Sequence, residues 1–383
     1  ATGCKDGNGE EVDWFVVVKF PRSDTHAVFY PTLQDFSISE VGLSSGGPIV
    51  ETLNQIYEGD ASYVMYNDEC PNCTRSATYG HAKGVAGWAS SGGFYLVHSV
   101  PQFPPKKSDG FSPRSALRNG HSFLCITLSR TELEKVGRQW HYIRPHLYDS
   151  HNIDLPSISA YASGAHVPNS FGNNHNIIPL TSLGGRSFDY FAKTASWGKD
   201  IFGLIAQTYD SPLVAVTSRN GSRSLPVECS AKNRVTDADE VVVAGRQWVG
   251  SVDQSKWCVT TQPARRRACV GDIDRTVAQL SRGGGMLCFQ GAIHDALSRG
   301  IVSGGRCAET TGYNANSEPS HKTNPDRNSN PSASQVSIII LGAIGVSLLF
   351  AGLVLFTLRR CCPREDHLDS GRRRAAEPSV MGI

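Results

Sequence analysis

Short apolar runs separated by polar and glycine-rich segments extend through most of the 383-residue chain. Residues 13–21 (Asp-Trp-Phe-Val-Val-Val-Lys-Phe-Pro) combine aromatic and β-branched side chains, a composition typical of a buried strand that the proline ends. Similar runs predict further strands at residues 61–66, 84–89, 94–97, 123–128, 213–218, 240–243, 256–260 and 285–289.

Helical spacing of apolar residues is clearest at residues 48–57. Pro48 is compatible with a first helical turn, and Ile49, Leu53 and Ile56 fall on one side of the helix. Further helices are predicted at residues 131–136 (ended by Gly137), 186–193, 200–208 and 292–298.

The strands at 84–89 and 94–97 are expected to form a hairpin around a Ser-Ser-Gly-Gly turn. This pairing places His98 at roughly the level of Val85, close to Lys83. Local geometry therefore predicts that histidine and lysine side chains gather at one end of the hairpin.

Strands and helices alternate in both halves of the chain, which predicts a fold of α/β layers. Residues from about 150 to 185 show weak periodicity and are expected to form long loops. The boundary between two halves, roughly 1–160 and 161–307, is placed inside this region. Residues 308–335 are rich in Ser, Asn and Pro, and they predict a flexible stalk.

Residues 336–358 contain no charged side chain and are long enough to cross a bilayer as a helix. Arg359 and Arg360 follow directly, so the tail at 359–383 is expected in the cytosol and the preceding residues outside it. The pattern predicts a single-pass type I membrane protein. A buried core helix is the alternative, and the length of the run disfavours it. Palmitoylation of Cys361 and Cys362 remains open.

The predicted ectodomain is electrically balanced, because the 358 residues before the tail carry 31 basic and 31 acidic side chains. These residues also hold 11 of the 12 histidines, so their net charge becomes positive near pH 5. Nine of the 11 cysteines lie in the same region, as expected for a disulfide-bonded protein of the secretory route. Glycosylation sequons at Asn72 and Asn220 are consistent with that route.

The candidate chemistry lies in the sequence Gly-His-Ala-Lys-Gly, which contains His81 and Lys83. The sequence Asp-Gln-Ser-Lys-Trp-Cys at 253–258 repeats this motif imperfectly, because Gln254 and Lys256 stand where the first motif has His81 and Lys83. Residues two apart in an extended strand point the same way, so each pair is expected to share a face. An imidazole beside an ammonium suits phosphate-ester chemistry, since the imidazole attacks or moves a proton while the lysine holds an oxygen.

Other motifs have alternative interpretations. The Cys-x-x-Cys at 70–73 is typical of redox or zinc sites, but it lacks the expected helix N-terminus and contains a sequon. The arginines at 265–267 suit either a DNA backbone or a solvated loop. The glycines at 283–285 indicate a tight backbone approach. His98 also suits a buried structural role, and Lys256 a solvated one.

An ordered set of motifs between Cys4 and Cys307 resembles the deoxyribonuclease II family. The matching segments are Val-Asp-Trp-Phe at 12–15, Tyr-Asn-Asp at 66–68, Gly-His-Ala-Lys-Gly-Val at 80–85, Leu-Val-His-Ser-Val-Pro-Gln-Phe-Pro-Pro at 96–105, Ser-Lys-Trp-Cys-Val at 255–259, Cys-Val-Gly-Asp at 269–272 and Arg-Gly-Gly-Gly-Met-Leu-Cys at 282–288.

The resemblance implies a phospholipase D-like fold, a pseudo-dimer of two α/β halves that each supply one His-x-Lys to a shared cleft. It also implies metal-independent cleavage of DNA at acidic pH, without a cofactor, leaving 3′-phosphate ends. The family's site residues correspond to His81, Lys83, His98 and Lys256, with His81 as the favoured nucleophile. Its second His-x-Lys histidine falls on Gln254, which can hydrogen-bond a phosphate but cannot transfer a proton.

By the same resemblance, disulfides are expected between Cys4 and Cys125, Cys229 and Cys307, and Cys269 and Cys288. Cys70 and Cys73 remain as a local pair, and Cys258 is left unpaired.

Two functions of different classes follow from these observations. The first is a membrane-anchored acid endonuclease acting on DNA in a lysosomal or endosomal lumen or outside the cell, impaired by Gln254. The second is a catalytically silent nucleic-acid-binding or surface-interaction protein that keeps the same fold. The oligomeric state does not follow from the sequence.

Overall fold

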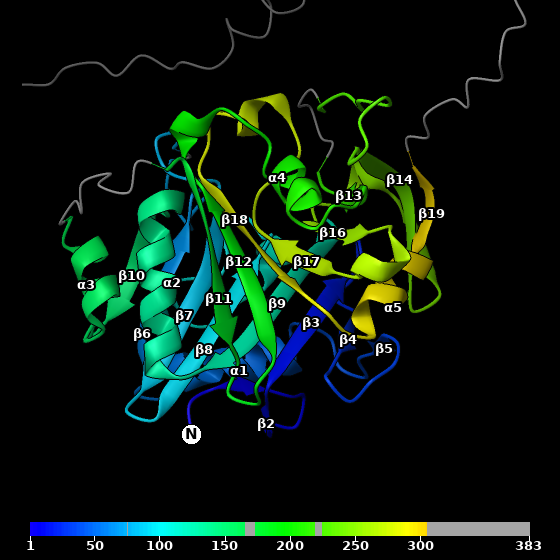
Figure 1. Cartoon of the computed structure of the whole chain (residues 1–383). Helices are drawn as coiled ribbons and strands as arrows, with labels where there is room; N and C mark the ends of the chain where they lie inside the picture. The colour runs from blue at the N-terminus through cyan, green and yellow to red at the C-terminus, as the bar shows by residue number, and fades with distance from the viewer. Residues whose placement is uncertain (75, 165–172, 219–223, 305–383) are drawn as a thin grey trace, which may run out of the picture. The chain divides into compact units, whose positions relative to one another are not determined.

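Two large β-sheets that pack face to face form the centre of the protein (Figure 1). The structure is a computed structural model, and it describes residues 1–74, 76–164, 173–218 and 224–304. The first sheet has the order β10-β6-β7-β8-β9-β3-β4-β5. Its strands are β3 (Trp14–Lys19), β4 (His26–Phe29), β5 (Ser37–Ile38), β6 (Ser62–Asn67), β7 (Lys83–Ala89), β8 (Gly92–His98), β9 (His121–Leu128) and β10 (Leu147–His151).

The second sheet is built from later residues, in the order β11-β12-β18-β17-β16-β13-β14-β15, with β19 paired to β14. Most neighbours are antiparallel, and β13 and β14 form a parallel pair. Its strands are β11 (His175–Thr181), β12 (Ser187–Lys193), β13 (Leu213–Val216), β14 (Val235–Val243), β15 (Arg246–Val249), β16 (Trp257–Thr260), β17 (Ala268–Gly271), β18 (Gly284–Phe289) and β19 (Ile301–Gly304).

Successive side chains of a strand enter two different hydrophobic cores, one on each face of the sheet. Trp14, Val16 and Val18 of β3 join the core shared by the two sheets, whereas Phe15 and Val17 face the opposite layer. Because side chains of a strand point to alternate faces, a strand of continuous apolar residues is buried on both sides. The shared core is held by aromatic contacts across the sheets, including Trp14 with Phe289 at 5.1 Å between ring centroids and Tyr95 with Tyr190 at 5.9 Å.

Helices cover the outer faces. The outer face of the first sheet packs against α1 (Pro48–Tyr57), and that of the second packs against α4 (Ile201–Thr208). Side chains of α2 (Arg130–Ile143) enter the shared core, and α3 (Pro156–Ala162) packs against α2. A shorter helix, α5 (Ile293–Arg299), contacts β14, β16, β17 and β19. The mixed α/β architecture expected from the sequence is confirmed.

Several predicted elements are confirmed with small shifts at their ends. The helix at 48–57 has the predicted bounds, and the buried strand at 13–21 corresponds to β3. The predicted hairpin is β7 with β8, but its register differs, because Gly92 and Gly93 already belong to β8. Gly84 therefore lies opposite Val97.

Three local predictions are wrong. The helix predicted at 186–193 is instead the strand β12 (Ser187–Lys193), which is paired on both sides and whose aromatic residues alternate between two cores. The region from 150 to 185 contains α3 and β11. The helix expected to end at Gly137 continues to Ile143. This glycine accommodates α3, which packs so closely that a side chain at 137 would overlap Ser157 Oγ.

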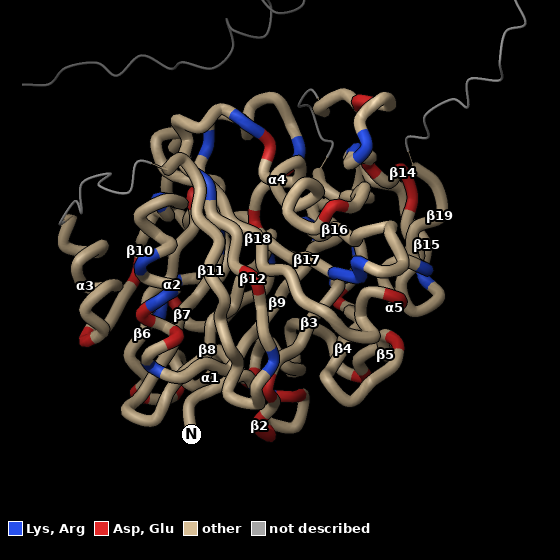
Figure 2. The backbone as a smooth tube through the Cα atoms, viewed as in Figure 1, with Lys and Arg blue, Asp and Glu red and all other residues tan. Residues whose placement is uncertain are grey.

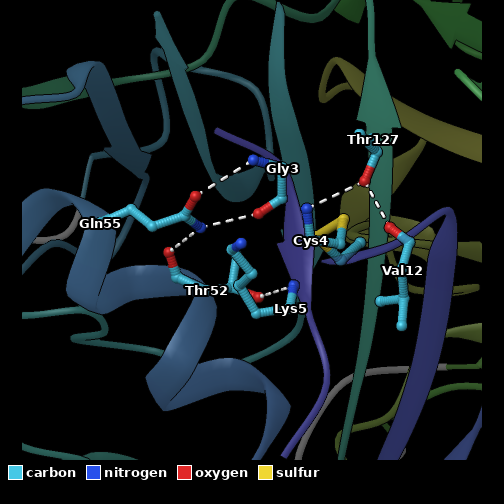
Figure 3. Close-up of a disulfide and its surroundings, with 8 residues drawn as sticks. Gly3, Cys4, Lys5, Val12, Thr52, Gln55 and Thr127 are labelled. Atoms are coloured by element: carbon cyan, nitrogen blue, oxygen red, sulfur yellow. Dashed lines mark hydrogen bonds between the residues drawn. A yellow bond between two sulfur atoms is a disulfide. The ribbon is translucent and has the colours of Figure 1, made fainter. Parts of the chain in front are cut away.

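Disulfides fix the N-terminus and the second sheet. Cys4 of the short strand β1 (Cys4–Lys5), which pairs with β2 (Glu11–Val12), is joined to Cys125 of β9. Thr127 Oγ1 accepts the Cys4 N–H at 2.9 Å, and Gln55 of α1 exchanges hydrogen bonds with Gly3 (Figure 3). The predicted Cys70–Cys73 and Cys269–Cys288 bonds are present, and Cys258 is buried with a free thiol.

Two predictions fall on residues that the structure does not describe. These are the Cys229–Cys307 disulfide, because Cys307 is not described, and the C-terminal region, which comprises the stalk at 308–335, the membrane segment at 336–358 and the tail at 359–383. Within the described residues, no helix has both the length and the apolar character needed to span a membrane.

The packing of α2 on α3 generates a stability prediction. Replacing glycine by alanine in a helix interior ordinarily stabilises it by about 1 kcal/mol. Gly137→Ala is expected to destabilise the protein by about 1–3 kcal/mol instead, because the new methyl group would lie 2.8 Å from the Ile158 backbone nitrogen. Gly203→Ala is the matched control, since Gly203 of α4 has open space around it and should show the ordinary gain. Urea unfolding measures both, and a gain at both positions would contradict the close packing.

Candidate active site

The two sequence motifs lie where strands begin. His81 precedes β7 and Lys83 opens it, while Gln254 and Lys256 directly precede β16. The second motif crosses the start of β9 in the first sheet, since the Gln254 N–H donates to the Gly120 carbonyl at 2.8 Å. The chain thus brings both motifs together from two different sheets.

Both motifs line one small cavity of about 140 Å³. Its volume is enough for a few water molecules, at roughly 30 Å³ each. The cavity is lined by Glu69, His81, Lys83, Ser99, Ser218, Gln254, Lys256, Asp274, Thr276 and Gln279.

A buried carboxylate organises the first motif. Asp68 lies just after β6, and its Oδ2 accepts hydrogen bonds from His81 Nδ1 at 2.9 Å and from Arg282 at 3.0 Å. Its Oδ1 accepts from Lys83 Nζ at 2.5 Å. Burial alone would raise the pKa of Asp68, but His81 and Lys83 hold that pKa well below its ordinary value. Asp68 is therefore ionised, and it fixes the ring of His81 with Nε2 pointing away from it.

Backbone contacts hold the His81 segment in place. The His81 N–H donates to the Gly283 carbonyl at 2.8 Å, and the Gly80 N–H donates to the Arg144 carbonyl at 2.8 Å. A side chain at Gly80 or Gly283 would overlap the carbonyl of Ile143. The tight approach expected at the glycines 283–285 is therefore present at Gly283, where the second half of the chain meets the first.

A second carboxylate bridges the two motifs. Asp274 Oδ2 lies 3.1 Å from His81 Nε2, and its Oδ1 accepts from Lys256 Nζ at 2.8 Å. The Ser218 N–H also donates to Oδ1, at 2.9 Å. Burial would raise the pKa of Asp274, but Lys256 and His81 hold it well below its ordinary value. His81 is thus held between two carboxylates, one on each ring nitrogen.

A third acid, Asp272, lies behind the cavity and behaves differently. It is fully buried, and its Oδ1 accepts the Gly285 N–H at 3.1 Å. Burial raises the pKa of Asp272 to about 7, because the lysine and histidine of the first motif only partly offset desolvation. This carboxyl gains its proton as the solution becomes mildly acidic.

The structure does not bring His98 into the cavity lining. Its side chain is fully buried, with Phe103 at 5.3 Å and Phe123 at 5.8 Å between ring centroids. Its Nδ1 accepts the Val100 N–H at 3.1 Å, and burial lowers the pKa of the imidazole well below its ordinary value. The neighbouring Ser99 lines the cavity instead, so a catalytic role for His98 stays a prediction.

Sequence reasoning missed the site's acids. No role is predicted for Asp68 or Asp274, although Asp68 belongs to the family motif at 66–68. The pairing of β6 with β7 could have located Asp68. Asn67 of β6 pairs with Lys83 of β7, which places the next residue, Asp68, beside His81. The stretch leading to Asp274 follows β17, whose antiparallel partner β16 begins next to Lys256.

The cysteines at 70–73 and two of the arginines at 265–267 are engaged in contacts within the fold. Cys70 and Cys73 form a disulfide, so they offer no thiolates, although ligand atoms of both lie within 4.8 Å of one another and of His146. Among the arginines at 265–267, Arg266 forms an ion pair with Asp295. Arg267 lies over the ring of Tyr209, at 4.9 Å.

Comparisons with known proteins agree over most of the described chain. A family model described as Deoxyribonuclease II matches residues 3–307. Plancitoxin-1 of Acanthaster planci is 34% identical over 327 residues, covering 78% of this chain and 90% of that protein. Deoxyribonuclease-2-alpha of Mus musculus is 34% identical over 318 residues, with 76% and 89% covered. Cell-death-related nuclease 7 of Caenorhabditis elegans is 30% identical over 304 residues, with 75% and 83% covered.

The raised pKa of Asp272 predicts a pH-dependent stability. An unfolded aspartate titrates near 3.9, so the folded chain holds a proton that the unfolded chain releases between about pH 4 and 7. This stabilisation is present below pH 4 and is lost as the pH rises through 7, by roughly 4 kcal/mol in total. Asp272→Asn should remove that loss, because the amide mimics the protonated acid and still accepts the Gly285 N–H.

Urea midpoints at pH 5 and pH 7.5 measure the effect. Asp210→Asn is the control, since that exposed side chain should leave the difference between the two pH values unchanged. Equal pH dependence in the parent and in Asp272→Asn would contradict the assignment.

Proposed function

The chain belongs to the deoxyribonuclease II family, and on this premise we propose that its cavity hydrolyses DNA phosphodiester bonds at acidic pH, without a metal, leaving 3′-phosphate ends. One observation carries the proposal. His81 and Lys83, held by Asp68, line the same cavity as Gln254 and Lys256. The finer fold proposal, a phospholipase D-like pseudo-dimer, is supported by the origin of these pairs in two sheets.

The geometry supports distinct roles for these groups. Asp68 accepts Nδ1–H of His81, and Nε2 attacks phosphorus after it has left Asp274 and released the proton of that hydrogen bond to solvent. Lys83 and Lys256 hold the non-bridging oxygens. The attack forms a phosphorus–nitrogen bond and breaks the bond from phosphorus to the 5′ oxygen. Water then attacks the phosphohistidine, which returns His81 and leaves the phosphate on the 3′ oxygen.

Gln254 limits this scheme. The departing 5′ oxygen needs a proton and the attacking water must lose one, but an amide side chain supplies neither transfer. Solvent must then carry out both proton transfers. The loss of a positioned acid–base group typically lowers the rate by about 10²–10⁴-fold. The proposed enzyme therefore cleaves slowly while its phosphate-binding cations remain.

Acidic conditions favour binding of a polyanion in this cavity. Basic and acidic residues are interspersed along the described backbone (Figure 2), and the 358 residues before the tail carry equal numbers of each, so no net positive charge draws DNA at neutral pH. Below pH 7 the raised pKa of Asp272 removes one negative charge next to the site. The charge near the phosphate then becomes more positive, which strengthens attraction for DNA.

A second function, on the same fold, is a silent nucleic-acid-binding or surface-interaction protein. The specific observation in its favour is Gln254, since binding needs no proton transfer. A gel-shift assay at pH 5 separates the two functions. Retention without cleavage supports the silent binder, and the absence of retention removes both DNA-directed functions.

We also propose that the chain is a single-pass type I membrane protein whose ectodomain faces a lysosomal or endosomal lumen or the cell exterior. The uncharged run at 336–358 and the arginines that follow it support this topology. The disulfides of the ectodomain support an oxidising compartment.

His81→Ala is expected to abolish plasmid nicking at pH 5, with a loss of at least about 10³-fold, because the nucleophile is removed. His151→Ala provides the matched control, since this exposed histidine of β10 lies outside the cavity lining. Nicking that survives in His81→Ala would show that this cavity does not carry the reaction.

Gln254→His is expected to raise nicking at pH 5 by about 10²–10⁴-fold, because an imidazole restores proton transfer at the leaving oxygen. The double variant His81→Ala/Gln254→His should be inactive, which ties any gain to the same cavity. No gain in Gln254→His would mean that the missing proton transfer is not what limits the rate.

A further inference from the structure

The side chain of Asp274 occupies a position that the proposed reaction needs. Its two oxygens contact two groups that line the cavity, His81 Nε2 at 3.1 Å and Lys256 Nζ at 2.8 Å. The first atom is the proposed nucleophile, and the second is a proposed ligand of the non-bridging oxygens. A phosphodiester bound for reaction would have to contact both.

A carboxylate resembles the part of a phosphate that such a site recognises. Both groups present a pair of oxygens that share a negative charge, and both accept charge-assisted hydrogen bonds from the same cations. Asp274 receives the Ser218 N–H as a third donor. The donors around it form an oxyanion site that consists of the His81 imidazole, the Lys256 ammonium and one backbone amide.

Neither motif depends on Asp274 for its position. Asp68 already orients His81 and holds Lys83, and the backbone N–H of Lys256 is fixed by Ser122 Oγ at 2.9 Å. The backbone next to Asp274 is anchored independently, because the guanidinium of Arg275 binds Asp237 and the Leu225 carbonyl. The Asp274 carboxylate can therefore leave the cations by side-chain rotation while the chain around it stays fixed.

We propose that Asp274 is an internal occupant of the phosphate-binding position, which a phosphate ester must displace before His81 can react. The inference rests on the proposed function, because it uses the same two cationic groups. In this role Asp274 lowers the affinity of the cavity for phosphate esters. It also covers Nε2 of His81 when no substrate is bound.

Lowering the pH does not release the Asp274 carboxylate from this position. Lys256 and His81 hold the pKa of Asp274 well below its ordinary value, in spite of its burial, so the carboxylate stays charged at pH 5. The titratable groups that face it are these two, with Lys83 and Asp68 behind His81. Displacement by an anion, rather than protonation, is the route by which the site opens.

The test compares two variants that each remove one negative charge from the same cavity. Asp274→Asn removes the bridge, because the amide nitrogen is a donor and cannot accept from both cations. Glu69→Gln removes a carboxylate that lines the same cavity and lies 3.5 Å from Lys83 Nζ, in the other motif. Inorganic phosphate is the probe, titrated by isothermal calorimetry at pH 5 into the parent and both variants, with thermal unfolding as the check of folding.

Asp274→Asn is expected to bind phosphate at least tenfold more tightly than the parent, and Glu69→Gln no more than about threefold more tightly. Phosphate binding by the parent with no gain in Asp274→Asn, or an equal gain in both variants, overturns the inference and leaves the proposed function standing. Absence of phosphate binding in all three folded proteins overturns both.

A second measurement uses the unaltered chain, and it decides the matter if Asp274→Asn fails to fold. A crystal structure of the parent soaked in phosphate should place phosphate oxygens within hydrogen-bonding distance of His81 Nε2 and Lys256 Nζ. The Asp274 carboxylate should have rotated away from both. Phosphate bound elsewhere, with the Asp274 bridge intact, overturns the inference.

Discussion

The buried carboxylate of Asp68 is the interaction on which the site depends. Removing a carboxylate from water costs several kcal/mol, and here His81 and Lys83 from one segment and Arg282 from another offset that cost. Arg282 comes from the segment before β18, so its bond to Asp68 also ties the second half of the chain to the first. Arg282 adds a bond to the Tyr79 carbonyl at 2.8 Å. One acid therefore sets the geometry of the motif with His81 and Lys83 and helps to join the two sheets.

Three aspartates near the cavity have the same chemistry but different charge states. Asp68 and Asp274 are ionised because the side chains that bind them outweigh their burial, whereas at Asp272 burial outweighs the bond from the Gly285 N–H and the influence of the first motif. Environments that push the pKa values of like groups apart are typical of sites that move protons or bind anions. The arrangement also limits the positive charge that two lysines would otherwise concentrate in a small cavity.

Local patterns predicted much of the fold, because many strands are buried on both faces and α1 has one apolar side. The segment 186–193 was misread because its apolar spacing suits a short helix, and only pairing with β11 and β18 decides for a strand. The family motifs identified the cavity residues His81, Lys83 and Lys256. Asp274 could not be found in the same way, since its role depends on contacts with residues 193 and 18 positions away.

The free thiol of Cys258 has a consequence for oxidative folding. Cys258, Cys269 and Cys288 lie directly opposite one another across β16, β17 and β18, so the central cysteine has a sulfur neighbour on each side. In the finished protein burial raises the pKa of Cys258, so the reactive thiolate hardly forms. Before the core closes, Cys269 can form a disulfide with either Cys258 or Cys288. The order in which these strands pair then decides whether the native bond forms at once or must be reached by thiol exchange.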